Sequence, residues 1–107
     1  MITEVVITGL GLVSSLGNDV ETMFTNLQAG RSGVKKMPEW EQYIGLRSLL
    51  AAPVHAYDPK QIERSARRTM SPMSEMALIA SRQALAHADL SEISSLRNLL
   101  VFGSTSG

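Results

Sequence analysis

Two short apolar runs without alternation predict strands that are covered on both faces. Residues 5–8 and 99–102 are rows of β-branched and other apolar side chains, which is typical of parallel strands between layers of helices. A weaker run at residues 49–54 indicates a second, poorer strand. Each strong run is followed directly by a glycine-containing loop. The pattern therefore predicts an α/β fold in which the first strand is central.

The first helix is expected after the glycine-punctuated loop at residues 9–17. Asn18 or Asp19 can cap it, and Glu21 stands three residues beyond Asn18, as in a capping box. Gly30 stands where a helix needs a left-handed residue after its end. Apolar side chains recur at i, i+3, i+4 and i+7, which gives the helix one apolar face; they are Val20, Met23, Phe24 and Leu27.

Two further helices are predicted by start signals that end in proline. Asp58 followed by proline opens a polar helix through about Thr69, and Ser71 followed by proline opens a second helix to about Ala88. The second helix is rich in alanine and has few polar positions, so we expect it to be mostly buried. Between residues 31 and 57 the pattern is weak and predicts at most a short turn near Trp40.

The number of buried faces exceeds what a chain of 107 residues can cover. One mostly buried helix and two covered strands require partners on every side. The sequence also stops in a glycine-serine loop after a strand, where open α/β sheets place their ligand sites. We therefore expect an incomplete part of one domain, whether truncated, degraded or cut by design, that aggregates or stays molten when produced alone.

Composition excludes several classes of protein. Ten basic and ten acidic side chains cancel, so no overall field steers the chain to nucleic acid or to a membrane surface. The apolar opening lacks the positive region of a signal peptide, since Glu4 stands there, and we expect a cytoplasmic protein. The chain has no cysteine, which excludes disulfides, thiolate metal sites and a cysteine nucleophile within these residues.

The glycines and histidines give no cofactor or metal site. Gly9 and Gly11 resemble the start of a dinucleotide fingerprint, but Ser14 replaces the third glycine and the next helix begins too late. The glycines favour a structural loop, and a free-standing nucleotide-binding domain is the alternative. His55 and His87 have no carboxylate or serine at motif spacing, which favours structural roles.

Four segments in order resemble the N-terminal part of the β-ketoacyl-acyl carrier protein synthase family. The segments are residues 5–18 (VVITGLGLVSSLGN), 27–34 (LQAGRSGV), 67–71 (RRTMS) and 101–107 (VFGSTSG). The serine pair at 14–15 and the stretch GLRS at 45–48 are most similar to the bacterial synthase I branch. The resemblance implies a thiolase-like layered α/β fold, of which residues 1–107 are an N-terminal fragment, and a homodimer.

The resemblance also implies the chemistry of fatty acid or polyketide-like chain elongation, without a cofactor. An acyl chain moves from acyl carrier protein to a cysteine, and decarboxylated malonyl-acyl carrier protein then attacks the thioester. In such proteins the cysteine and two catalytic histidines come later in the chain, so no catalytic residue maps onto this sequence. The 107 residues are expected to be inactive alone, and the whole protein is either a condensing acyltransferase or a non-catalytic chain-length or scaffolding partner.

A basic cluster is the candidate docking site for acyl carrier protein. On one continuous helix its members would share a face at i, i+4, i+7 and i+8; they are Lys60, Arg64, Arg67 and Arg68. The resemblance implies basic residues at positions matching Arg64 and Arg68, although Ser65 stands where a lysine is often found. A plain solvated helix face, partly neutralised by Glu63, is the alternative.

The final loop is the second candidate site. In the family, the loop matching residues 104–107 approaches the acyl pocket near the dimer interface. The small side chains of Ser106 and Gly107 would then help to limit acyl-chain length, and a bulky replacement would shorten the product. A plain turn that needs small residues is the alternative.

Overall fold

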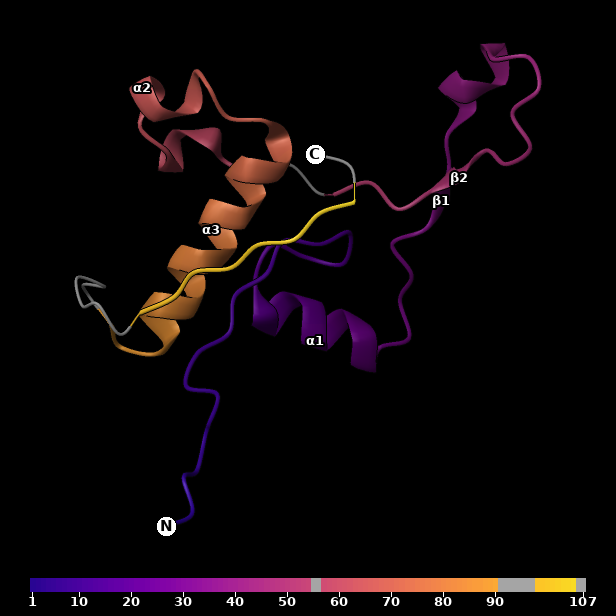
Figure 1. The fold of residues 1–107 in the computed structure, drawn as a ribbon. Coiled ribbons are helices and arrows are strands. Elements are labelled where there is room, and N and C mark those ends of the chain that lie inside the picture. Colours follow the sequence, from indigo (N-terminus) through magenta and orange to yellow (C-terminus); the bar gives the residue numbers. More distant parts are fainter. Residues whose placement is uncertain (55–56, 91–97, 106–107) are drawn as a thin grey trace. The chain divides into compact units, whose positions relative to one another are not determined.

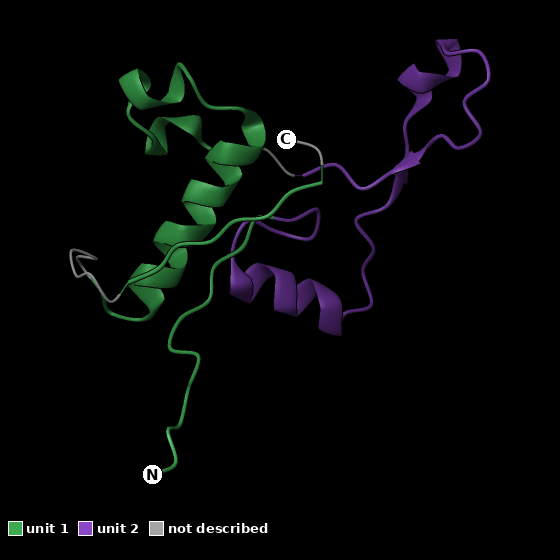
Figure 2. Ribbon diagram, in the orientation of Figure 1, with its two compact units in different colours: residues 1–13, 58–107 green, residues 14–57 purple. Residues whose placement is uncertain are grey.

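The computed structural model describes residues 1–54, 57–90 and 98–105 and divides the chain into two compact units. Unit 1 comprises residues 1–13 and 58–107, and unit 2 comprises residues 14–57 (Figure 2). The elements of unit 2 are α1 (Val20–Gln28), β1 (Lys35–Lys36), the 3₁₀ helix η1 (Pro38–Gln42) and β2 (Leu50–Ala51). The elements of unit 1 are the 3₁₀ helix η2 (Pro59–Gln61), α2 (Arg64–Arg67) and α3 (Pro72–His87) (Figure 1).

Helix α1 begins and ends with the caps that the sequence predicts. Of the two candidate N-caps, Asp19 is the one used, and its carboxylate accepts hydrogen bonds from the Thr22 backbone N–H at 2.7 Å and from the Thr22 hydroxyl at 2.9 Å. These hydrogen bonds, the backbone one first, lower the pKa of the Asp19 carboxyl. At the other end Gly30 adopts φ 67°. The Arg31 N–H then bonds to the Asn26 carbonyl at 3.0 Å, which completes a Schellman motif.

A tight turn precedes α1 and is tied to it. The backbones of Ser14 and Gly17 exchange hydrogen bonds of 2.9 and 3.3 Å. The Ser14 hydroxyl donates to the Gly17 carbonyl at 2.9 Å. The amide of Asn26 on α1 donates to the Leu16 carbonyl. The turn is therefore held by side chains as well as by its own backbone.

The rest of unit 2 is a short antiparallel hairpin. Lys35 pairs with Ala51 and Lys36 pairs with Leu50, and η1 lies in the connection between the strands. The sequence predicted a strand over residues 49–54, of which only β2 forms. Its partner β1 was not predicted, because two consecutive lysines carry no apolar strand signal.

Helix α3 also has the predicted ends. The Ser71 hydroxyl accepts a hydrogen bond from the Ser74 N–H at 3.3 Å, and the helix ends at His87. Asp89 follows in the left-handed region at φ 56°, and the Leu90 N–H reaches the Leu85 carbonyl at 2.9 Å. Among the described residues, no helix is long and apolar enough to cross a membrane.

The core of unit 1 is small. Ile62 and Ile79 are exposed by only 2% and 3%, and they are the buried apolar side chains of the described chain. The guanidinium of Arg82 on α3 donates to the Gln61 carbonyl at 2.6 Å beside them. The prediction that α3 is mostly buried is wrong here, since Ile79 is its one buried residue in the part described.

Two glycines let residues 9–12 lie directly on α3. A Cβ atom added to Gly9 would collide with the carbonyl oxygen of Ala84, and one added to Gly11 would collide with that of Ala80. Backbone therefore packs on helix backbone at this place, as only glycine allows. These glycines have the structural role that the sequence favoured.

Two side chains of α3 hold the same segment by hydrogen bonds. The Leu10 N–H donates to Nδ1 of His87, and the Leu12 N–H donates to Oε1 of Gln83, both at 3.1 Å. His87 therefore has a structural partner, in line with the sequence interpretation, whereas His55 lies outside the described residues.

The two strong strand predictions are wrong for the described chain. Residues 5–8 and 99–102 form no strand, and Val5 is 91% and Leu99 86% exposed. A parallel strand needs hydrogen-bonding neighbours and helices on both faces, and the described residues provide neither. Instead residues 98–105 run as an extended segment along α3 (Figure 1).

Candidate functional site

The predicted docking cations lie on two elements rather than on one helix. Lys60 belongs to η2, whereas α2 begins at Arg64. Between them Ile62 is extended, with φ −112° and ψ 132°. Burying Ile62 in the core contributes roughly 1.5–3 kcal/mol, which outweighs the weak helix preference of a few polar residues. The prediction of one continuous helix from Asp58 to about Thr69 is therefore wrong.

The three arginines still share one helical turn. Arg64 and Arg67 are the first and last residues of α2, and Arg68 follows with helical angles of φ −56° and ψ −29°. Spacings of i+3 and i+4 place all three on the same side of the turn. Arg64 and Arg68 are exposed, as is Lys60, while Arg67 is half-buried. We call residues 60–68 the basic segment.

An apolar cavity of unit 1 lies between α3 and the extended segment that precedes the final loop in sequence. It has a volume of about 340 Å³ and is bounded by α3 and residues 100–104. Its lining includes Met73, Ala77, Leu78, Leu100, Phe102 and Ser104. Ser106 and Gly107 themselves lie outside the described residues. The small side chain of Ala77, one turn after Met73, was the sequence signal for this hollow, which was interpreted only as close helix packing.

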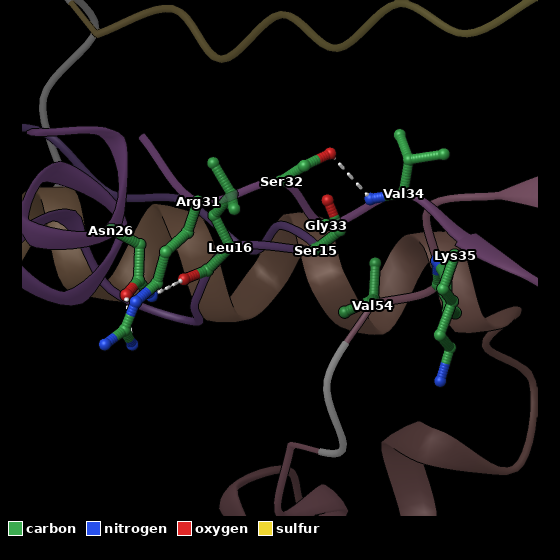
Figure 3. Close-up of a pocket in the computed structure, with 10 residues that line it drawn as sticks. Ser15, Leu16, Asn26, Arg31, Ser32, Gly33, Val34, Lys35 and Val54 are labelled. Carbon is green, nitrogen blue, oxygen red and sulfur yellow. Dashed lines mark hydrogen bonds between the residues drawn. The ribbon is translucent and has the colours of Figure 1, made fainter. Parts of the chain in front are cut away.

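A second pocket, in unit 2, was not predicted. It has a volume of about 450 Å³ and is bordered by the turn before α1, by α1 and by the loop into β1 (Figure 3). Its lining includes Ser15, Asn26, Arg31, Ser32, Gly33 and Lys35. In the sequence, residues 27–34 carried only a family signature, and the closely spaced cations Arg31 and Lys35 were the available signal.

No metal centre is present in the part of the chain that the structure describes, where no three histidine, cysteine, aspartate or glutamate residues cluster.

Comparisons with known proteins agree on one family. The family model "Beta-ketoacyl synthase, N-terminal domain" matches residues 3–107. 3-oxoacyl-[acyl-carrier-protein] synthase 1 of Haemophilus influenzae is 35% identical over 104 residues, which cover 95% of this chain and 25% of that protein. The synthase 1 of Escherichia coli K12 is 40% identical over 86 residues, which cover 80% of this chain and 21% of that protein.

A solved structure extends the likeness to the fold. The crystal structure of a beta-ketoacyl synthase from Burkholderia phymatum STM815 is 36% identical, with a TM-score of 0.75 over 89% of this chain and 24% of that one. The chain thus spans about a quarter of the length of the relatives that it matches. The predicted fold class and the likeness to the N-terminal part of the β-ketoacyl synthases are confirmed. With its thiolase-like α/β fold, the chain belongs to the β-ketoacyl synthase family, whose N-terminal domain it matches.

Proposed function

We propose that this chain works within a 3-oxoacyl-[acyl-carrier-protein] synthase of fatty acid elongation. The observation that carries the proposal is the family match along residues 3–107, together with synthase 1 relatives at 35% and 40% identity. The proposal includes a homodimer in the cytoplasm, as the resemblance implies.

The reaction is a decarboxylative Claisen condensation. A cysteine thiolate takes the acyl group from its carrier protein thioester and releases the carrier thiol. Malonyl-acyl carrier protein loses CO₂, and the resulting carbanion attacks the acyl-cysteine carbonyl and expels the thiolate. Because the 107 residues contain no cysteine, the nucleophile has to come from outside them. Residues 1–107 would contribute structure and carrier-protein docking to this reaction.

The test is a condensation assay on the complete product of the gene that encodes this chain. Purified protein is mixed with acyl- and malonyl-acyl carrier protein, and mass spectrometry follows the 3-oxoacyl product and the acyl-enzyme. We expect both species from the complete product and neither from residues 1–107 alone. A complete product without a reactive cysteine, or one that forms no 3-oxoacyl product, would favour the non-catalytic chain-length or scaffolding partner.

We also propose that the basic segment docks acyl carrier protein. Carrier proteins present an acidic helix, and complementary charge speeds and orients such encounters. Arg64 and Arg68 are exposed on one side of the same turn, and guanidinium groups engage carboxylates bidentately. Lys60 would contribute from the neighbouring element, whereas half-buried Arg67 would contribute less.

A charge reversal tests the docking role. In the complete enzyme, Arg68→Glu should raise the KM for carrier-protein substrates about tenfold and weaken its salt dependence. Transfer from a small acyl thioester should be unchanged. Arg47→Glu, at an exposed arginine outside the basic segment, is the matched control. If Arg68→Glu lowers carrier-protein and small-thioester kinetics equally, the residue has a structural role instead.

The acyl-pocket role of Ser106 and Gly107 remains part of the proposal. The apolar lining of the cavity between α3 and residues 100–104 supports it, because Leu100 and Phe102 come just before Ser106 in the sequence. Ser106→Phe in the complete enzyme should shorten the longest product. Unchanged product lengths would leave the loop a plain turn.

A further inference from the structure

The pocket of unit 2 combines two cations with polar walls. Arg31 and Lys35 both line it, and none of its lining residues is acidic. All carboxylates of residues 14–57 stand elsewhere; they are Asp19, Glu21, Glu39 and Glu41. The hollow therefore carries two positive charges that no carboxylate in its wall balances.

The arginine is held in place by its neighbours. Nη1 of Arg31 donates to Oδ1 of Asn26 at 3.2 Å, and the Asn26 amide in turn donates to the Leu16 carbonyl. This chain of hydrogen bonds orients the guanidinium and leaves most of its five N–H groups for a ligand. A fixed guanidinium loses little entropy when it binds a planar anion.

Strand geometry sets the side chain of Lys35 apart from Glu41. Lys36 forms an ion pair with Glu41 at 2.7 Å. Successive side chains of a strand point to opposite faces, so Lys35 points away from the face where Glu41 is engaged. Lys35 is the residue of the pair that lines the pocket.

The two cations lie at opposite ends of the lining residues. Arg31 lies beside Leu16 and Asn26, whereas Lys35 lies beside Val54 at the other end (Figure 3). The side chain of Ser15 lies between them. Gly33 packs directly against Ser15, and a Cβ at Gly33 would collide with the serine hydroxyl, so glycine allows this close contact within the pocket wall.

We propose that this pocket binds a short linear organic dianion, with one carboxylate or phosphate end on Arg31 and the other on Lys35. A cavity of about 450 Å³ holds a short aliphatic chain between two such groups. The site lies wholly in unit 2 and uses no residue of the basic segment. The proposed site is therefore built from residues other than those of the basic segment.

The test is isothermal titration of the complete gene product with glutarate as the linear dianion. Butyrate, which has one charged end, and inorganic phosphate, which is compact, are the comparison ligands. We expect glutarate to bind at least about tenfold more tightly than either, because each charge-assisted contact contributes that order of affinity. Equal affinity for butyrate would refute the two-ended site, and no measurable glutarate binding would overturn the proposal.

Variants locate the binding. Arg31→Gln should weaken glutarate binding about tenfold or more, and Lys35→Gln should weaken it several-fold. Lys36→Gln, at the neighbouring lysine outside the pocket, is the matched control and should leave the affinity unchanged. Gly33→Val should also reduce binding without altering charge, because its side chain would collide with Ser15 and displace the pocket wall. Wild-type affinity in both Arg31→Gln and Lys35→Gln would refute the proposal, and thermal melting confirms that each variant is folded.

Discussion

The contact between residues 9–12 and α3 predicts a large effect of a single methyl group at Gly11. In Gly11→Ala, the new Cβ would overlap the Ala80 carbonyl oxygen, a backbone atom that cannot rotate away. The segment has to lift from the helix, and the hydrogen bond from the Leu12 N–H to Gln83 is strained or lost.

Three contributions set the loss of local stability in Gly11→Ala. Overpacking of this kind costs roughly 1–3 kcal/mol, and one lost hydrogen bond costs about 1 kcal/mol more. Replacing glycine by alanine also stiffens the unfolded chain, which returns about 0.5 kcal/mol. We therefore expect a net loss of roughly 1.5–3.5 kcal/mol in local stability.

Amide hydrogen exchange in the complete gene product measures this loss. Protection of the Leu12 amide should fall about 10- to 300-fold, since 1.4 kcal/mol corresponds to a factor of ten. Gly103→Ala is the control, because no atom lies within 4 Å of a Cβ built there. Leu12 exchange at the wild-type rate in Gly11→Ala would refute the close packing of this segment on α3.

Three further predictions concern the caps and the chain alone. In the complete gene product, Ser71→Ala should lower the free energy of unfolding by about 1 kcal/mol. Ser71→Asp keeps an acceptor at the cap and should not lower it. Equal losses in both variants would contradict the capping role. Because the native pKa of Asp19 is lowered, its stabilising contribution is present above the usual carboxyl pKa and lost as pH falls through the lowered value. Asp19→Asn should therefore remove part of the acid sensitivity, and an unchanged acid-unfolding profile would count against this. Residues 1–107 alone should show no cooperative melt, given exposed side chains such as Val5; a sharp transition would contradict that expectation.

The helix ends could be predicted from sequence because their signals are local. Asp19 and Ser71 accept hydrogen bonds from backbone N–H groups three residues on, and Gly30 adopts the left-handed angle that a helix end requires. Each depends on residues within about one turn. The same signals set the limits of α1 and α3 almost to the residue.

Features that depend on distant neighbours could not be predicted in this way. Ile62 interrupts the polar helix because burial in the core favours an extended residue, and the polar pattern around it gives no sign of this. The strand predictions at residues 5–8 and 99–102 required pairing partners that the described residues do not supply. The local pattern of apolar and polar residues indicates which faces are apolar, but not which other residues cover them.

The candidate sites also differ in whether their residues are close together in the sequence. The basic segment was found because its arginines are neighbours in sequence, and only the assignment of Lys60 to the same helix is wrong. The unit 2 pocket was missed because Ser15, Arg31 and Val54 come from separate parts of the chain. Their proximity depends on the turn, α1 and the hairpin together.

The hydrogen bond from Leu10 to His87 fixes the tautomer of the imidazole. Since Nδ1 accepts the backbone N–H, the ring proton of the neutral histidine resides on Nε2. The imidazole thereby ties the glycine segment at residues 9–12 to the last residue of α3 through one defined ring nitrogen.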